Sequence, residues 1–226
     1  MSKQEIRILS TKELLINQKQ FLLNADFFVV EADFIQTKTI DFDLKTVNDV
    51  LIFTSQNAVK AVLEHKEASQ LKTKTVFCVG LKTKGLLEEN GFKVEAYAGY
   101  AEDLGQIIAL VYSDNQYTFF TGNLRRDTLP HILTEAGIVF NEIQVYETVL
   151  TPQKIESNAD GILFFSPSAV ESYMKNNRIN KEIAFCIGET TASTAADFGY
   201  KNIVTANQPT VENTIIQAIN YFGSKH

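Results

Sequence analysis

Residues 51–62 read LIFTSQNAVKAV, and residues 162–173 read ILFFSPSAVESY. Each stretch begins as a short apolar run, passes through a turn of small polar residues, and continues with helical spacing. This pattern indicates a strand that leads directly into a helix. When the two stretches are aligned, Ser55 falls on Ser166, which lies 111 positions later. The fold is therefore expected to rest on a strand–turn–helix unit that occurs twice.

Two further pairs of segments repeat in the same order. TVFCVGLKTKGLLEENGFK (75–93) resembles IAFCIGETTASTAADFGYK (183–201), with Gly80 on Gly188, 108 positions later. IRILSTKELLINQKQFLLNADFFVV (6–30) lines up with TFFTGNLRRDTLPHILTEAGIVFNE (118–142), with Ala25 on Ala136. Three blocks in the same order at nearly constant spacing predict a duplicated module of roughly 110 residues.

Within each module, apolar runs alternate with helical patterns. The expected strands are Ile6–Leu9, Phe27–Val30, Val50–Phe53, Thr75–Val79, Lys93–Ala96, Gln116–Phe120, Ile138–Val145, Gly161–Phe165, Ile183–Ile187 and Ile203–Thr205. Ser10 with Glu13, and Ser168 with Glu171, have the spacing of capping boxes at helix starts. Gly91, Gly137 and Gly199 are placed to end helices. Alternation of Val-, Ile- and Phe-rich strands with helices predicts parallel sheets covered on both faces.

Two segments interrupt the alternation, Glu31 to Asn48 and Glu147 to Ala159, and neither has a helical period. Parallel neighbours in one sheet need a crossover, nearly always a helix, so the chain is expected to change sheets at both segments. This predicts a discontinuous first domain (1–33 plus 148–226) and an inserted second domain (40–144). The crossings at 34–39 and 145–147 would form a two-stranded linker that acts as a hinge. With five parallel strands each, both domains would be flavodoxin-like α/β domains.

The composition excludes several classes of protein. The formal net charge is −6, with 45% apolar and 21% charged residues, and no long basic run is present, so nucleic acid is not an expected partner. The N-terminal sequence has no apolar signal segment, and no stretch approaches 18 apolar residues, which predicts a cytoplasmic protein without membrane spans. No apolar stripe demands a partner, so a monomer is expected.

Neither a catalytic thiolate nor a metal site is expected. Cys78 and Cys186 lie in the apolar runs FCVG and FCIG, and the sequence places none of the three histidines beside them. Both are therefore predicted to be small buried strand residues. The scarcity of His and Cys argues against a metal centre.

In open parallel sheets, ligands bind beyond the carboxyl ends of the strands. The turns expected there contain small hydroxyl residues and glycine, and an ordinary N-cap explains each one taken singly. Their recurrence in both modules instead predicts several helix N-termini around one small anionic ligand. The candidate ligand-binding residues are Thr54, Ser55, Thr83, Gly122, Arg126, Ser166, Ser168, Thr190 and Thr191.

Two more side chains in these regions are candidates for chemistry. Arg126 is expected in the first turn of a helix, where a cation is unfavourable for the helix dipole. A ligand contact would explain its presence, although exposure to solvent alone could tolerate it. Tyr146 lies in VYET at the entry to the second crossing. It could pack against the linker strands, or its phenol could donate a proton to a leaving hydroxyl.

Taken in order, these segments resemble the uroporphyrinogen-III synthase family over nearly the whole chain. The resemblance is carried by IFTSQNAV, FCVG with Thr83, GNLRRDTLPHILTEAG followed by VYET, FFSPSAVESY, CIGETTASTAADFGY and the PTVENTIIQAI tail. It implies two flavodoxin-like domains and a cofactor-free lyase. Such an enzyme closes hydroxymethylbilane, a linear tetrapyrrole with eight carboxylates, to uroporphyrinogen III with loss of water and inversion of ring D.

The resemblance also implies roles for single residues. Tyr146 matches the tyrosine proposed to assist loss of the hydroxyl, Thr83 and Thr191 match polar positions facing the cleft, and Arg126 matches the arginine of a Gly-x-x-x-Arg stretch that begins at Gly122. Ser55, Ser166 and Ser168 match helix starts near the substrate carboxylates. Gln56 and Glu189 stand where the family often has proline, and the carboxylate of Glu189 opposes an anion at its turn.

Two other classes of function fit part of the pattern. A non-catalytic two-lobed binding protein or sensor for a small anionic ligand would share the hinged α/β architecture. A nucleotide-binding enzyme is disfavoured because neither G-x-G-x-x-G nor G-x-x-x-x-G-K-[ST] occurs.

Overall fold

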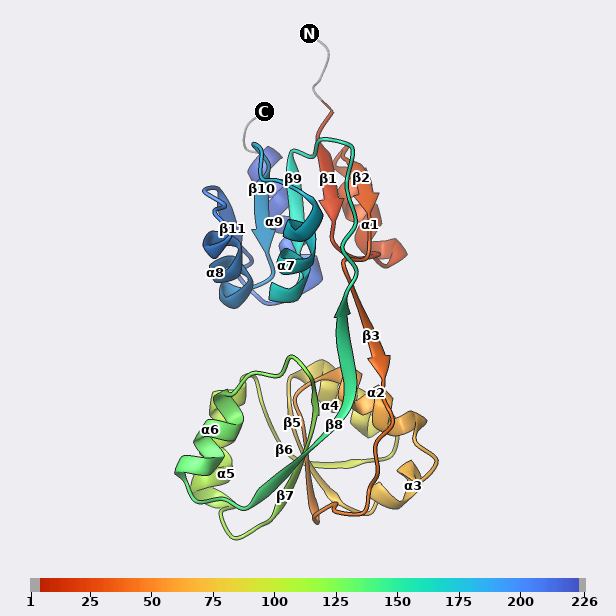
Figure 1. Ribbon diagram of the computed structural model, residues 1–226, viewed down its shortest axis with the longest axis vertical. Coiled ribbons are helices and arrows are strands. Elements are labelled where there is room, and N and C mark those ends of the chain that lie inside the picture. Colours follow the sequence, from red (N-terminus) through yellow and green to blue (C-terminus); the bar gives the residue numbers. More distant parts are fainter. Residues whose placement is uncertain (1–4, 224–226) are drawn as a thin grey trace. The chain divides into compact units, whose positions relative to one another are not determined.

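The apolar runs of the repeat form parallel strands in two separate sheets (Figure 1). The computed structural model describes residues 5–223, and its contacts divide the chain into two units. Unit 1 contains the chain up to Gln36 and from Val149 onward, and unit 2 contains Thr37–Thr148. The sequence had placed the corresponding boundaries at residues 33 and 148 and at residues 40 and 144.

Unit 1 holds a five-stranded sheet in the order β11-β10-β9-β1-β2, with every pair of neighbours parallel. Its strands are β1 (Arg7–Ser10), β2 (Phe28–Glu31), β9 (Gly161–Phe164), β10 (Ile183–Cys186) and β11 (Ile203–Thr205). The neighbouring β1 and β9 come from distant parts of the chain, with Leu9 opposite Ile162.

Unit 2 holds a six-stranded sheet in the order β3-β8-β7-β4-β5-β6. Its strands are β3 (Ile35–Thr39), β4 (Val50–Phe53), β5 (Thr75–Val79), β6 (Lys93–Ala98), β7 (Tyr117–Gly122) and β8 (Phe140–Leu150). The strands β8-β7-β4-β5-β6 are mutually parallel. The expectation of five strands in each sheet is therefore correct for unit 1, whereas unit 2 gains β3 at its edge.

The duplicated modules exchange strands between the sheets. Counted within each repeat, β1 and β2 are the first two strands of the N-terminal module, and β9, β10 and β11 are the last three of the C-terminal module. When β3 is left out and each strand is numbered by its place in its module, these five strands stand in the unit 1 sheet in the order 2-1-3-4-5. In unit 2, β7 and β8 join β4, β5 and β6 in the same order. Each sheet is thus completed by strands from both copies of the repeat.

Helices cover both faces of each sheet, as the buried strands require. In unit 1 they are α1 (Ile16–Asn24), α7 (Pro167–Asn176), α8 (Glu189–Asp197) and α9 (Val211–Gly223). In unit 2 they are α2 (Gln56–Glu64), α3 (Ala68–Leu71), α4 (Leu81–Glu89), α5 (Ala101–Val111) and α6 (Thr128–Glu135). Within the described residues, no helix is long and apolar enough to cross a membrane.

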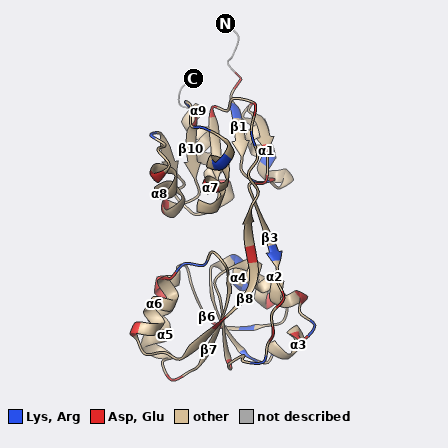
Figure 2. Cartoon of the chain, in the orientation of Figure 1, with Lys and Arg blue, Asp and Glu red and all other residues tan. Residues whose placement is uncertain are grey.

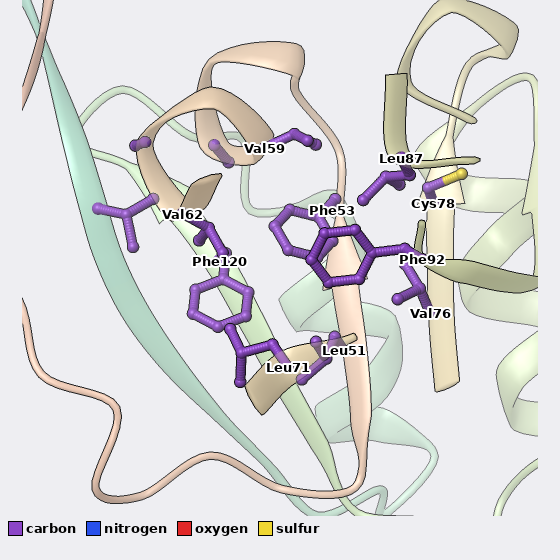
Figure 3. Close-up of a cluster of buried hydrophobic side chains, with 13 residues drawn as sticks. Leu51, Phe53, Val59, Val62, Leu71, Val76, Cys78, Leu87, Phe92 and Phe120 are labelled. Atoms are coloured by element: carbon purple, nitrogen blue, oxygen red, sulfur yellow. The ribbon is translucent and has the colours of Figure 1, made fainter. Parts of the chain in front are cut away.

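The core of unit 2 shows why its strands read as unbroken apolar runs. Leu51 and Phe53 of β4 pack under α2 and α4, while Val50 and Ile52 pack against α5 and α6 on the other face. Figure 3 shows the first of these clusters, in which the rings of Phe53 and Phe120 stack with their centroids 5.0 Å apart. Full burial of each such side chain contributes about 1.5–3 kcal/mol to stability.

Both interrupting segments lack a helix, as predicted. They pair with each other instead: Ile40 N donates to Val145 O at 3.1 Å, and Thr151 N donates to Phe34 O at 2.9 Å. Because residue numbers rise along β3 as they fall along β8, this pair is antiparallel. β8 also extends to Leu150, beyond the predicted strand end at Val145, because β3 supplies a second hydrogen-bonding edge.

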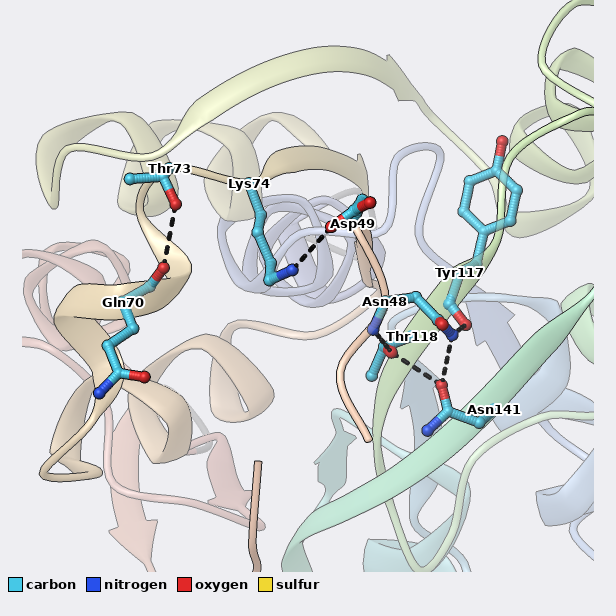
Figure 4. A network of polar contacts seen from close by, with 8 residues as sticks. All are labelled: Asn48, Asp49, Gln70, Thr73, Lys74, Tyr117, Thr118 and Asn141. Carbon is cyan, nitrogen blue, oxygen red and sulfur yellow. Dashed lines mark hydrogen bonds and ion pairs between the residues drawn. The ribbon is translucent and has the colours of Figure 1, made fainter. Parts of the chain in front are cut away.

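A partly buried polar network fastens the end of the first crossing to the unit 2 sheet (Figure 4). Asn48 N donates to Thr118 Oγ1 at 2.8 Å, and Thr118 Oγ1 donates to Asn141 Oδ1 at 2.7 Å. The Asn48 amide also donates to Asn141 Oδ1 and to the carbonyl of Tyr117. Asn141 in turn donates to Thr46. These bonds supply partners for a segment with no secondary structure of its own.

Gly91, Gly137 and Gly199 follow α4, α6 and α8 with φ of 83°, 69° and 102°, which confirms them as helix-ending residues. The capping box predicted at Ser10 is wrong. Ser10 ends β1 and donates to the carbonyl of Lys12, and α1 begins only at Ile16.

The two cysteines are confirmed as buried strand residues, Cys78 on β5 and Cys186 on β10. Burial raises the pKa of Cys78 to about 11 and that of Cys186 to about 12. Both therefore remain thiols at neutral pH, and the thiolate is the reactive form.

We expect neither cysteine to react with a thiol reagent at pH 8 in the folded protein, and both to react once the chain is unfolded in guanidinium chloride. The measurement is the number of thiols titrated over time in each condition. Rapid native labelling that precedes any loss of circular dichroism would contradict the burial of these thiols.

Candidate functional site

The order 2-1-3-4-5 places a topological switch point between β7 and β4 in unit 2, and ligands of open α/β sheets bind beyond strand ends at such points. Thr54 and Ser55 follow β4, and Gly122 ends β7. Ser55 is the N-cap of α2, and its hydroxyl accepts from Asn57 N at 3.1 Å. Two of the predicted turns therefore lie on adjacent strand ends.

Thr83 lies in the first turn of α4, which follows β5, the next strand along the sheet. Gly80 precedes this helix with φ of 88°, a conformation that favours glycine. The Thr83 side chain is only 5% exposed, yet its hydroxyl has no side-chain hydrogen bond among residues 5–223. A nearly buried hydroxyl at a helix start is therefore free to bind a ligand.

The loop after Gly122 carries two arginines with different surroundings. Arg125 is held by Glu142 and Asp127, and its hydrogen bonds to Glu142 raise the pKa of this guanidinium. Arg126 is exposed and makes no ion pair within the described chain. The expectation that Arg126 lies in a helix is wrong, because α6 begins at Thr128 and is preceded by Asp127. Arg126 is therefore an unpaired cation on a loop.

Tyr146 lies on β8 opposite Gly122, and the side chain is partly buried against the cluster beneath α2. Its ring covers the glycine directly: a Cβ built on Gly122 would be 2.5 Å from Tyr146 Cε2 and 2.8 Å from Cε1. The phenol hydroxyl has no hydrogen-bond partner among the residues that the structure describes. Its proton is thus not engaged by any residue from 5 to 223.

In unit 1, the switch point lies between β1 and β9. Ser166 is the N-cap of α7, and its hydroxyl accepts from Ala169 N at 3.1 Å. Ser168 lies 3.0 Å away, Oγ to Oγ, in the first turn. The capping box predicted at Ser168 is therefore wrong, because Pro167 occupies the first helical position and makes Ser166 the cap.

The start of α8 repeats the arrangement of α4. Gly188 precedes the helix, Thr190 is exposed, and Thr191 is 2% exposed without a side-chain hydrogen bond in the described part of the chain. Thr83 and Thr191 thus occupy equivalent positions in the two units. Glu189 stands at the first position of α8, where Leu81 stands in α4, so only the α8 start carries its own carboxylate.

Two residues at these edges are not among the candidates chosen from the sequence. Lys12 follows β1 at the unit 1 switch point, with its Nζ 5.2 Å from the centre of the Phe165 ring. Asn123 follows β7, and its side-chain amide bonds the backbone of Thr148 in both directions. The turn that contains Asn123 was expected beyond its strand, whereas Lys12 lies three residues after the predicted strand Ile6–Leu9.

Figure 2 shows Lys and Arg positions distributed along the described parts of both units, among Asp and Glu positions. Among residues 5–223, no group of three or more His, Cys, Asp or Glu side chains is placed to hold a metal ion. The groups at the strand ends are hydroxyls, helix N-termini, the Arg126 guanidinium and one phenol. They can bind an anion and supply a proton.

Parallel α/β sheets with helix starts and free hydroxyls at their carboxyl edges are typical of α/β enzymes that act on anionic small molecules. A family model described as uroporphyrinogen-III synthase HemD matches residues 21–216. The chain therefore belongs to the uroporphyrinogen-III synthase family, whose members are cyclising enzymes of tetrapyrrole biosynthesis. The resemblance found in the sequence is confirmed, and the non-catalytic sensor is not favoured.

Individual relatives agree with the family match. The uroporphyrinogen-III synthase of Saccharomyces cerevisiae is 30% identical over 128 residues, which cover 49% of this chain and 46% of that protein. That of Chlorobaculum parvum is 24% identical over 173 residues, which cover 67% of this chain and 70% of that protein. This chain thus spans about half of the yeast relative in that match.

A solved structure confirms the α/β fold with largely parallel sheets. The uroporphyrinogen-III synthetase of Helicobacter pylori has a TM-score of 0.76 at 21% identity, covering 96% of this chain and 99% of that one. A structure of the mutant enzyme from Thermus thermophilus has a TM-score of 0.67 at 15% identity, covering 98% and 100%.

Proposed function

We propose that this chain converts hydroxymethylbilane to uroporphyrinogen III, with loss of water and inversion of ring D. The observation that carries the proposal is the family match over residues 21–216, because this range includes Tyr146 and the starts of α2, α4, α7 and α8. The proposal needs no cofactor. The substrate closes spontaneously to the symmetrical isomer, so the protein's contribution is chiefly to hold the chain for the disfavoured closure.

In the first step, the Tyr146 phenol donates its proton to the terminal hydroxyl while the C–O bond breaks. The bonding electron pair stays with oxygen, water leaves, and an azafulvene cation remains. Ring D attacks this cation through its substituted carbon and forms a spiro intermediate, which fragments and recloses with ring D inverted. The proton released when the last pyrrole regains aromaticity restores the phenol, so protons balance over the cycle.

The eight substrate carboxylates would be bound at helix starts. In unit 2, the starts of α2 and α4 supply two such binding positions. The residues around them are Thr54, Ser55, Thr83, Gly122 and Arg126. In unit 1, the starts of α7 and α8 supply two more binding positions. The residues around them are Ser166, Ser168, Thr190 and Thr191. Each start contributes about 0.3–1 kcal/mol through its dipole, before hydrogen bonds are counted. Glu189 weakens the contribution of α8.

We also propose that the two units are flavodoxin-like domains joined by a two-stranded linker at the paired crossings. The strand order 2-1-3-4-5 in each sheet and the β3–β8 pairing support this description. A cytoplasmic monomer remains part of the proposal, and nucleic acid is not proposed as a partner because the net charge is −6 and no basic run is present.

The decisive test is an isomer assay. Hydroxymethylbilane is generated freshly in the presence of the purified protein, and the oxidised products are separated by isomer. We expect the type III product to dominate. Only type I product, formed at the spontaneous rate in the presence of folded protein, would overturn the proposed function.

Arg125 and Arg126 are neighbours in the loop after β7, so matched substitutions can test whether Arg126 alone binds the substrate. Arg126→Gln is expected to raise KM by about five- to tenfold with stability unchanged, because it removes a charged contact with a carboxylate. Arg125→Gln is expected to lower stability by about 1 kcal/mol with little effect on KM, because this guanidinium is already paired with Glu142.

Initial-rate kinetics and urea unfolding of both variants distinguish the two roles. An unchanged KM in Arg126→Gln would remove this residue from the binding site. A raised KM in both variants would show instead that the shape of the whole loop matters.

A further inference from the structure

The contact between Tyr146 and Gly122 is unlike the other close glycine contacts in the described chain. Gly122 does not have a positive φ, so its backbone conformation does not require glycine. What requires glycine is space, because a side chain would overlap the hydroxyl-bearing end of the Tyr146 ring, where Cζ is the nearest atom. At Gly105 and Gly161, the overlapping atoms belong to the partly buried Ile132 and to the buried core residue Phe185.

A bulge brings the ring to this position. Thr121 lies opposite Gln144, but Gly122 lies opposite Tyr146, so β8 contributes one more residue than β7 at this step. Side chains normally alternate between the faces of a sheet, yet Val145 and Tyr146 both pack against the same core cluster. The bulge has therefore turned Tyr146 toward the face on which Gly122 leaves room, and bulges commonly re-aim side chains in this way.

The Asn123 side chain makes two hydrogen bonds to the backbone of Thr148, just beyond Tyr146 on β8. We call this pair of bonds the clasp. Thr148 N donates to Asn123 Oδ1 at 2.7 Å, and Asn123 Nδ2 donates to Thr148 O at 3.2 Å. The amide thereby replaces the backbone pairing that ends at Gly122. β8 is held to the end of β7 on both sides of Tyr146, by the ladder before it and by this clasp after it.

We propose that Gly122 and Asn123 are positioning residues that fix the Tyr146 phenol for proton donation, an inference that rests on the proposed function. No hydrogen bond within the described chain orients the phenol, so the packing of its ring on Gly122 and the hold on β8 set its position. A displacement of about 1 Å in a reacting group lowers turnover by about a hundredfold. The glycine and the clasp prevent such a displacement.

Gly122→Ala tests the steric part of the inference. We expect kcat for type III formation to fall by about ten- to a hundredfold with KM within about twofold of wild type. The double variant Gly122→Ala with Tyr146→Phe tests whether the fall in kcat depends on the phenol. A purely structural role of Gly122 would not depend on it. If Gly122 acts through the phenol, Gly122→Ala lowers kcat less than about twofold in the Tyr146→Phe background. Equal losses in both backgrounds, or no loss in the wild-type background, would overturn the inference.

Gly105→Ala is the matched control for a steric clash in the same unit, because its Cβ would lie 2.9 Å from Ile132 Cγ2. It is expected to lower the melting temperature with kcat unchanged. A fall in kcat that followed the melting temperature in both variants would identify the Gly122 effect as a loss of folded protein and contradict the inference.

The clasp is tested without relying on activity. In wild-type protein with labelled tyrosine and glycine, we expect a nuclear Overhauser effect between the Tyr146 ring protons and the Gly122 α-protons, and we expect Asn123→Ala to weaken it. An absent effect in an active wild-type protein overturns the positioning inference alone. A strong effect in a protein that forms only type I product overturns the proposed function while the contact stands.

Discussion

Replacement of Tyr146 by phenylalanine is expected to lower kcat for type III formation by about a hundredfold or more while the fold is retained. A positioned general acid contributes about 10²- to 10⁴-fold to rate, and phenylalanine keeps the ring but removes the proton. The hydroxyl has no partner among the described residues, so no protein hydrogen bond is lost with it. The ring contact with Gly122 is preserved, and KM is expected to change little.

The measurement is the rate and the isomer ratio of the product, together with the melting temperature. Slower enzymatic closure leaves more substrate to close spontaneously, so the type I fraction is expected to rise. Tyr112→Phe is a suitable control, because Tyr112 follows α5 near the opposite end of β7 and its ring packs edge-on against Phe77. Full type III activity in Tyr146→Phe would exclude an essential acid at this position.

Thr118→Val is expected to lower the free energy of unfolding by about 2–3 kcal/mol. Valine has nearly the same shape, but it removes the hydroxyl that accepts from Asn48 N and donates to Asn141 Oδ1. Thr118 is fully buried, so water cannot replace the lost partners. An unsatisfied buried polar group costs about 1–3 kcal/mol, and the Asn48 N–H is left in that state.

Urea unfolding followed by circular dichroism measures the effect. Thr39→Val provides the control, because the Thr39 hydroxyl also makes one side-chain hydrogen bond, to Glu64 at 2.8 Å, but on the exposed surface. Its effect is expected to stay within about 0.5 kcal/mol. Equal effects of the two substitutions would show that the network of Figure 4 adds nothing to the stability of unit 2.

Local sequence patterns located most elements of the fold. The strands Val50–Phe53, Thr75–Val79 and Ile203–Thr205 have the bounds that their apolar runs predicted. The start of α1 could not be found in this way. The N–H groups of Glu13 and Leu14 donate to Asp33 and Glu31, so distant carboxylates bind the groups that Ser10 was expected to cap.

Local sequence patterns also located the strand ends that carry the candidate site. Hydroxyl residues after apolar runs identify strand ends, because the chain of a parallel sheet must turn there into a helix. The sequence selected Arg126 partly because a helix start was expected there, and that expectation was wrong. It could not show that Arg125 is paired, since its partner Glu142 lies on β8. It gave no indication that Gly122 serves to admit the Tyr146 ring, because the bulge that brings them together is a feature of strand pairing.

The sequence by itself determined the duplicated module, the alternation of strands and helices, and the two places where the chain changes sheets. These features depend on local spacing and on apolar periodicity, which each segment carries alone. Only the tertiary structure decided that β3 joins the unit 2 sheet as an added edge and that β8 continues to Leu150. The physical reason is that an edge strand is defined by its hydrogen bonds to a partner far away in the sequence, and no local pattern contains that pairing.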